Sequence, residues 1–253
     1  MDKASRGRLT FRQELADFWH FFRHPTLRRL PGRNASSSLG SDWWPGLRPG
    51  RLLAWAIALW VINMALFGPL AVAVADKLGA AHRLDPEHVP VLIAVIWAPM
   101  VEEMLFRYSM RRPAQALWLC PLAIVLVLWP VRPWSWVLLV CVLLAACLPL
   151  RRGRIARGRW ASDWRREYVR RYGLIYHLVS LVFAAVHLHN FIFDKTTFWL
   201  LPFLVLPQWV TGLVLGWMRT RRGIGASMAL HALFNGGPVA VILVMLRFLP
   251  GSV

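Results

Sequence analysis

The chain has 253 residues, of which 57% are hydrophobic, and its 30 Lys and Arg residues against 12 Asp and Glu give a formal net charge of +18. A mean hydropathy of +0.47 excludes a disordered polar chain and is typical of a polytopic membrane protein rather than a soluble globule. A soluble protein this basic would suggest nucleic-acid binding. Here the basic residues are better explained by membrane topology, so no nucleic-acid partner is expected.

Several hydrophobic segments approach the length of about 20 residues that a helix needs to cross the bilayer core. A tight turn, Pro130-Val131-Arg132-Pro133, separates two shorter segments. The predicted fold class is therefore all-α, a polytopic transmembrane helix bundle. Its seven predicted spans cover residues 51–75, 89–110, 114–130, 134–150, 173–193, 198–218 and 224–248.

The basic residues between these spans alternate in density. Residues 1–51, 111–112, 151–171 and 219–222 hold 24 Lys and Arg, whereas the opposite connections and the C-terminal end hold five. This positive-inside pattern predicts a cytoplasmic N-terminus, an outer C-terminus and attraction to the anionic headgroups of the lipid bilayer. Arg outnumbers Lys 27 to 3, which hints at a GC-rich genome and a bacterial inner membrane.

The N-terminal 50 residues are expected to form a basic cytoplasmic segment, and residues 51–253 the transmembrane domain. No cleavable signal peptide is visible. Leu9 to Phe22 has a bulky apolar face that favours either an interfacial helix ending before Pro25 or, with equal weight, a frayed tail. Gly32 to Gly50 has the composition of a linker. The loop 151–171 is either a dock for an acidic peptide or, as we favour, a topology and lipid-headgroup loop.

Two adjacent carboxylates, Glu102 and Glu103, lie inside the second predicted span. Each charge costs about 2.5–3.5 kcal/mol at the bilayer centre, so such residues need partners or a function. Glu103 and Arg107 are i and i+4 residues and can pair on one helix face. Glu102 points about 100° away around the helix and lacks that partner. An ion pair between helices explains Glu103 and Arg107, whereas Glu102 is the candidate for chemistry.

Histidines occur within two later spans. In the fifth, Phe183 and His187 are i and i+4 residues. A lone histidine in an apolar helix is more often a packing residue, and we interpret His177 and His189 in this way. His187 is different only in combination with Glu102, because a carboxylate and an imidazole together can orient and deprotonate a water molecule.

In the seventh span, His231 and Asn235 share a face. Their hydrogen-bond donors suit an oxyanion, for which each positioned donor contributes about 2.7–4 kcal/mol. A His–Asn bond between helices, worth about 0.6 kcal/mol in membranes, explains the pair equally well. At 1.5 Å per residue from the inner end of each span, Glu102 and His231 lie roughly 13 and 10 Å deep, and His187 roughly 20 Å. One cavity opening to the cytoplasm can therefore receive all three.

These three motifs, Glu102-Glu103-x-x-x-Arg107, Phe183-x-x-x-His187 and His231-x-x-x-Asn235, occur in this order. Together they resemble the CAAX protease and bacteriocin-processing (CPBP, or Abi) family, which includes the type II prenyl-protein endopeptidases. The resemblance covers roughly residues 89–240, and each motif alone is weak. Members of that family usually have about eight helices, one more than the seven spans predicted here.

The resemblance implies an intramembrane endopeptidase acting on a membrane-associated protein or peptide. Glu102 and His187 would activate the water, and His231 and Asn235 would stabilise the oxyanion, with Glu103, Arg107 and Phe183 in support. A metal-free glutamate peptidase is favoured and no cofactor is expected. The alternative is a metalloprotease-like site in which Glu102, His187 and His231 would bind zinc.

Two non-peptidase functions are weighed against this hypothesis. One is a non-catalytic scaffold or immunity protein of the same fold, against which the complete motif set argues. The other is a proton-coupled transporter, since Glu and His also form proton relays. No internal repeat is evident and no broken half-helices are expected, which disfavours a transporter.

Cys120, Cys141 and Cys147 lack metal or redox spacing and are expected to be packing residues.

Overall fold

The computed structural model describes residues 9–30, 42–43, 47–83, 88–148, 159–194 and 198–248, without the side chains of 159–162. Within these ranges the chain is mostly helical and forms two compact units. Unit 1 comprises Met1–Leu47, Val101–Val179 and Gly216–Ser227, and unit 2 comprises Arg48–Met100, Ser180–Leu215 and Met228–Val253. The predicted linker lies mostly outside the described residues.

In unit 1, helix α1 (Phe11–Arg23) confirms the helical alternative for Leu9 to Phe22. A capping box begins it: the Thr10 hydroxyl accepts from the Gln13 amide at 3.3 Å, and the Gln13 side chain accepts from the Thr10 amide at 2.8 Å. Phe18 and Phe21 are buried on its inner face. Phe21 also lies under the Arg221 guanidinium, whose Cζ is 4.8 Å from the ring centre.

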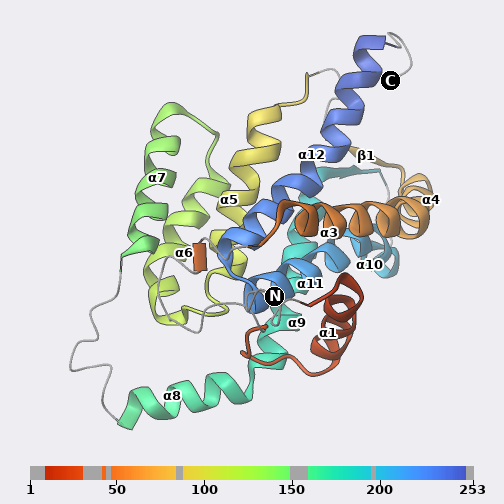
Figure 1. Cartoon of the computed structure of the whole chain (residues 1–253). Helices are drawn as coiled ribbons and strands as arrows, with labels where there is room; N and C mark the ends of the chain where they lie inside the picture. The colour runs from red at the N-terminus through yellow and green to blue at the C-terminus, as the bar shows by residue number, and fades with distance from the viewer. Residues whose placement is uncertain are drawn as a thin grey trace, which may run out of the picture. The chain divides into compact units, whose positions relative to one another are not determined.

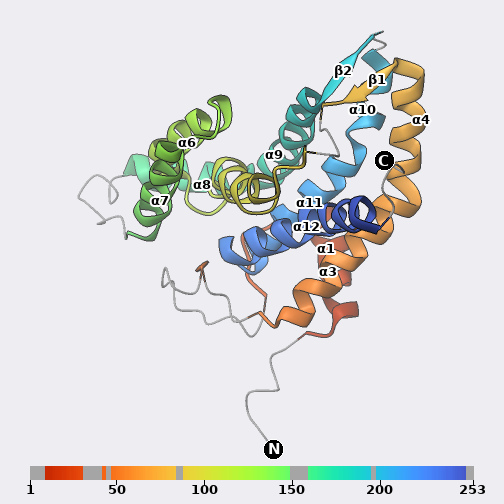
Figure 2. The same ribbon diagram turned by 90° about the horizontal axis from the view of Figure 1, so that it is seen from above.

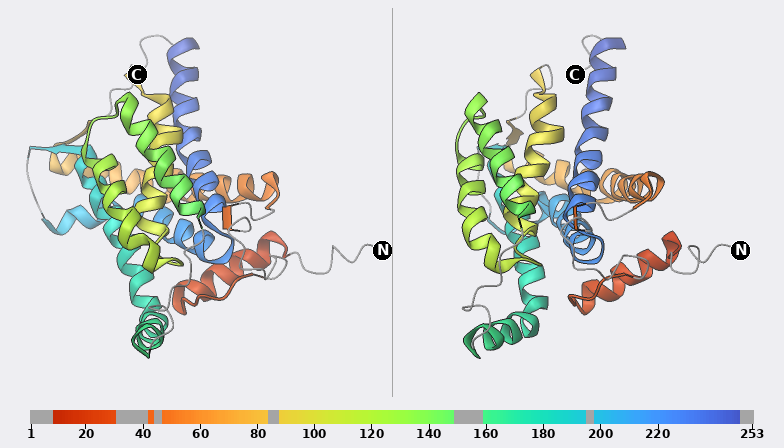
Figure 3. Two further views of the ribbon diagram at one scale, coloured as in Figure 1. Left: turned by 90° about the vertical axis from the view of Figure 1, so that its left-hand side faces the viewer. Right: turned by 60° about the vertical axis from the view of Figure 1, so that its left-hand side comes forward.

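Two antiparallel helices, α6 (Pro113–Leu128) and α7 (Pro133–Cys147), lie side by side in unit 1 (Figures 1 and 3). The Tyr108 hydroxyl forms hydrogen bonds with both helices: with Gln115 Oε1 of α6 at 2.7 Å and with the Ala146 carbonyl oxygen of α7 at 3.0 Å. The exposed helix α8 (Arg159–Arg170) then leads into α9 (Tyr172–Val186).

Unit 2 begins with α3 (Pro49–Ile62) and α4 (Gly68–Leu78), which are joined by a π-helical turn at Asn63–Phe67. Gly79, with φ of 57°, ends α4 in the left-handed conformation that suits glycine. Strand β1 (Ala80–His82) then pairs antiparallel with β2 (Phe191–Phe193), with Ala81 opposite Ile192 (Figure 2). This small sheet is the only departure from the all-α prediction within the described residues.

Each of the seven predicted spans contains helix, but residues 191–193 of the predicted span 173–193 form strand β2, and residues 149–150 of the span 134–150 lie outside the described residues. Three are long and apolar enough to cross a membrane: Pro49–Leu78, Tyr172–Asn190 and Ile224–Phe248, the last forming α12. A fourth combines Phe198–Leu204, which includes α10 (Leu201–Leu204), with α11 (Leu206–Arg221). The α6 and α7 helices are apolar but shorter. The count of seven spans stays a prediction.

One expectation about these spans is wrong. The sequence predicted no broken half-helices, but the segment Phe198–Arg221 bends by 50° between Leu204 and Leu206. Pro207 follows this break and has no amide hydrogen to continue the preceding helix. The bend therefore has a local cause, and the predicted span 198–218 consists of two helices.

Candidate active site

Helix α5 (Ala98–Glu102) is followed by a π-helical turn, Glu103–Arg107, which carries the first motif in unit 1. The predicted ion pair is present: Arg107 Nη1 lies 3.3 Å from Glu103 Oε1, and both side chains are fully buried. The Ser227 hydroxyl donates a hydrogen bond to the other Glu103 oxygen, Oε2. Glu103 is thus held by a cation and a hydroxyl.

Glu102 is half-buried, in contrast to its fully buried neighbour. Its charge also acts on Arg107, although Glu103 has the stronger effect. One guanidinium therefore lies within the field of both carboxylates, although its ion pair is with Glu103. The two glutamates still differ, since the close ion pair with Arg107 and the hydrogen bond from Ser227 both belong to Glu103.

The π-helical turn changes which carbonyl oxygens of this helix are available. The Tyr108 amide donates to the Glu103 carbonyl at 2.9 Å, an i+5 bond instead of the i+4 bond to Met104. The freed Met104 carbonyl faces the Cys120 thiol, with sulfur and oxygen 3.8 Å apart. Cys120 is therefore half-buried against this turn, and all three cysteines are free thiols.

The end of the motif helix is held by a buried arginine from α11. Arg219 Nε donates to the Arg107 carbonyl at 3.0 Å, and its Nη1 donates to Asp42 Oδ1 at 2.7 Å. A second cation, Arg112, lies 3.4 Å from Asp42 Oδ2. Carbonyls at a helix end lack intrahelical partners, so Arg219 and its counter-ion Asp42 complete the hydrogen bonding of the turn that carries Glu103.

The second motif lies in unit 2. The Phe183 ring is centred 4.6 Å from the His187 ring and 5.9 Å from the His231 ring, so it separates two imidazoles that both contact it edge-on. His187 Nδ1 lies 2.7 Å from the Phe183 carbonyl oxygen. A carbonyl oxygen only accepts, so Nδ1 carries the hydrogen, and in the neutral ring Nε2 holds the lone pair. In this tautomer Nε2 is the basic nitrogen of the ring.

Asn235, one turn after His231 on α12, is anchored by a second π-helical turn, Ile93–Trp97. Because the Ala98 amide donates to the Ile93 carbonyl, the Ala94 carbonyl is released from the helix ladder. Asn235 Nδ2 donates to it at 3.0 Å. The Asn235 amide is therefore fixed in orientation and keeps a second hydrogen on Nδ2 for another acceptor.

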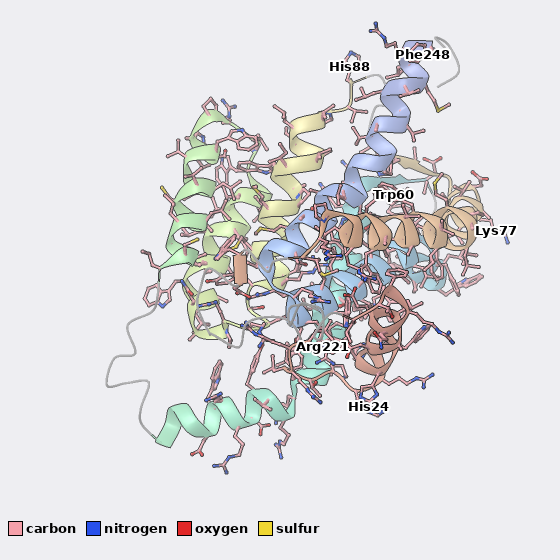
Figure 4. The ribbon with its side chains drawn as sticks, viewed as in Figure 1. His24, Trp60, Lys77, His88, Arg221 and Phe248 are labelled. Carbon is pink, nitrogen blue, oxygen red and sulfur yellow. The ribbon has the colours of Figure 1, made fainter. Side chains whose placement is uncertain are left out.

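Trp60 packs close to the backbone of α12 next to this asparagine (Figure 4). Its indole nitrogen donates to the Phe234 carbonyl at 2.9 Å. A Cβ atom at Gly237 would lie 2.3 Å from Trp60 Cζ2, so only glycine permits this approach. Trp60 thus fixes the helix turn that carries Asn235.

Six residues that contact the motif side chains, or help to hold the turns that carry them, were not identified as part of the site from the sequence: Ser227, Arg219, Asp42, Cys120, Ala94 and Trp60. Only Ser227 has a clear signal, since Ser227, His231 and Asn235 follow at intervals of four on one helix.

Among the described residues, no group of three His, Cys, Asp or Glu side chains is arranged to hold a metal ion. The His187 hydrogen bond to a backbone carbonyl is a pattern that metal-binding histidines also use.

Long apolar helices define an integral membrane protein, and each of its two units holds buried polar side chains. The family model for the Rce1-like type II CAAX prenyl endopeptidases matches residues 85–237. The chain belongs to this family, as the three motifs indicated, and membership supports peptidase activity. Comparison with curated proteins and with solved structures finds no match.

Proposed function

We propose that the protein is an intramembrane endopeptidase that cleaves a membrane-associated protein or peptide through a water molecule activated by Glu102 and His187. The observation that carries the proposal is the hydrogen bond from His187 Nδ1 to the Phe183 carbonyl, which leaves Nε2 as a base. Family membership supplies the reaction class.

The reaction needs a base, an oxyanion site and a proton donor for the leaving amine. Glu102 takes one proton from a water molecule whose other hydrogen is accepted by His187 Nε2. The water oxygen attacks the scissile carbonyl carbon, and the carbonyl oxygen becomes an oxyanion. His231 and the second Asn235 hydrogen donate to that oxygen. When the C–N bond breaks, the proton passes to the amine, so the products are a carboxylate and an amine. Each glutamate thus has one role: Glu102 is the base and Glu103 is structural.

Ser227 relates the first motif to the third, which supports the proposal that both belong to one site. Ser227, which donates to Glu103, and His231 are separated by one turn in the sequence of α12. We propose that His187 completes this site and that it opens to the cytoplasm, with the N-terminus on the same side and the C-terminus outside, in a bacterial inner membrane. Water activation by Glu102 and His187 needs no metal ion.

The decisive experiment compares protein termini in membranes of cells that carry the parent chain or Glu102→Gln. Loss of the base should reduce cleavage about 10²–10⁴-fold, so a specific set of new termini should disappear. Asp76→Asn is the matched control, because Asp76 is exposed on α4. Identical termini in the parent and Glu102→Gln would contradict the peptidase and favour a scaffold function or a transporter.

A second comparison tests His187 on purified protein with a lipid-anchored CAAX-type reporter peptide. His187→Ala should lose cleavage, and His189→Ala, an exposed neighbour, should retain it. Thorough chelation should leave the parent rate unchanged. A loss of activity on chelation that zinc restores would overturn the metal-free mechanism and leave the site assignment intact.

A further inference from the structure

A shallow cavity lies in unit 1 where α8 meets the first turns of α9. Its volume is about 290 Å³, just below the range of roughly 300–1,000 Å³ usual for small-molecule sites. Two aromatic and three aliphatic side chains line most of it, completed by one acidic and one basic residue: Trp164, Tyr168, Leu174, Ile175, Leu178, Glu167 and Arg171. A shallow, mainly apolar groove of this size suits one hydrocarbon chain rather than a folded peptide.

The groove lies at the end of a membrane span. Helix α9 begins at Tyr172 and belongs to the span Tyr172–Asn190, whereas α8 precedes it and runs off to the side (Figures 1 and 3). Leu174 and Leu178 are 59% and 49% exposed, and an exposed apolar strip on a span contacts lipid. Trp164 stacks on Tyr168 with ring centres 5.6 Å apart, and such aromatic pairs belong at the membrane interface.

The charge around the groove favours an anionic occupant. Exposed arginines follow α8 at positions 165, 166, 170 and 171, against two acids, Asp163 and Glu167. Glu167 accepts from Arg170 at 2.8 Å and also pairs with Arg171. Four guanidinium groups against two carboxylates make this helix net positive beside the groove, and basic sites beside membrane helices bind anionic lipid headgroups.

The groove is also connected to the motif helix. The Tyr168 hydroxyl donates to the Ser109 carbonyl at 3.0 Å, two residues after Arg107. Burial is the main cause that raises the pKa of Tyr168 above its usual value, and the nearby Tyr172 adds to it. The hydroxyl therefore keeps the proton that it donates. The position of α8, and of whatever occupies the groove, is thus coupled to the end of the Glu103–Arg107 turn.

We infer that the α8–α9 groove binds one anionic phospholipid, with an acyl chain along Leu174 and Leu178 and the headgroup phosphate beside Arg171. The site is separate from the proposed peptidase residues and does not depend on that function. An arginine provides the phosphate contact, because the guanidinium offers paired donors to two phosphate oxygens. The occupant is a lipid and not an acidic peptide, because the apolar lining matches a hydrocarbon chain.

The first test is photo-crosslinking of the full chain in phosphatidylcholine nanodiscs with a trace of phosphatidylglycerol that carries a photoreactive acyl chain. Crosslinks should concentrate in the peptide covering residues 164–178, and excess unlabelled phosphatidylglycerol should abolish them. Crosslinks spread evenly over the exposed spans would overturn the proposal, and so would equal competition by phosphatidylcholine. This measurement needs no variant and is unaffected by folding defects.

The second test is native mass spectrometry of the purified chain with phosphatidylglycerol or phosphatidylcholine. Arg171→Gln should weaken the phosphatidylglycerol adduct about fivefold, the factor expected for one basic residue at an anionic lipid surface, and leave phosphatidylcholine unaffected. Leu174→Ala with Leu178→Ala should weaken both adducts. The control pair Leu117→Ala with Leu144→Ala removes leucines from α6 and α7 that are more exposed than those of the groove, and it should change neither adduct.

The outcomes separate the occupants. Unchanged adducts in both groove variants contradict the lipid site. Displacement of the photoreactive lipid from residues 164–178 by a soluble polyglutamate peptide, without displacement by phosphatidylglycerol, would assign the groove to an acidic peptide and also overturn the proposal.

Discussion

Glu103 and Arg107 form an ion pair in which neither side chain is exposed, with Nη1 and Oε1 3.3 Å apart. A buried pair of this kind contributes little net stability compared with apolar residues, but removal of one partner leaves an uncompensated charge. The pair explains why two adjacent carboxylates have different roles. Glu103 is enclosed with its cation and Ser227, whereas Glu102 is half-buried.

Single changes in this pair should destabilise the fold. Arg107→Gln leaves the Glu103 carboxylate buried without its cation, and we expect the free energy of unfolding to fall by about 3–5 kcal/mol. The double variant Glu103→Gln with Arg107→Gln should lose less than the sum of the two single variants, because the charges disappear together. Thermal unfolding in detergent measures both. Additive losses would contradict the coupling.

Asp42 should be required for stability although it lies far from the motifs in the sequence. It is 1% exposed and bonds the fully buried Arg219. Asp42→Ala leaves that cation without its counter-ion, which costs about 3–5 kcal/mol. Asp163→Ala is the control: Asp163 and Arg166 form an exposed pair on α8, and its loss should not change the melting temperature. Equal melting temperatures for both variants would refute the Arg219–Asp42 contribution.

Asn235 should act mainly on the rate of the chemical step. Loss of one oxyanion donor costs about 10²–10³-fold in kcat, so Asn235→Ala should lower kcat and leave KM little changed. The variant also removes the donor to the Ala94 carbonyl, which costs about 1–3 kcal/mol of stability. A rise in KM at constant kcat would instead assign Asn235 to substrate binding.

Topology can be tested in a variant whose three native cysteines are replaced by alanine. We expect Lys77→Cys, at the end of α4, to react with a membrane-impermeant maleimide in intact cells, because it lies in a sparsely basic connection. Arg166→Cys on α8 should react only after lysis. The opposite labelling pattern would invert the predicted orientation.

Much of the candidate site could be predicted from the sequence because its signals are local. Glu103 and Arg107 are one helix turn apart, and so are Phe183 and His187, and these contacts follow from helix geometry alone. The N-terminal helix was likewise one of two alternatives that its apolar face and Pro25 after its end indicated. The span count was less predictable, because apolar runs such as α6 and α7 are shorter than a bilayer crossing and their hydropathy does not settle the question.

The sequence by itself determined that the protein is helical, membrane-embedded and supplied with three ordered polar motifs. Only the tertiary structure decided which atoms those motifs use. The π-helical turns at Ile93–Trp97 and Glu103–Arg107 free single carbonyl oxygens. Asn235 contacts the first across 141 residues of the chain, and Cys120 contacts the second from the following helix α6. Arg219 and Asp42 meet across 177 residues. Such contacts depend on packing between helices, which leaves no periodic trace in the sequence.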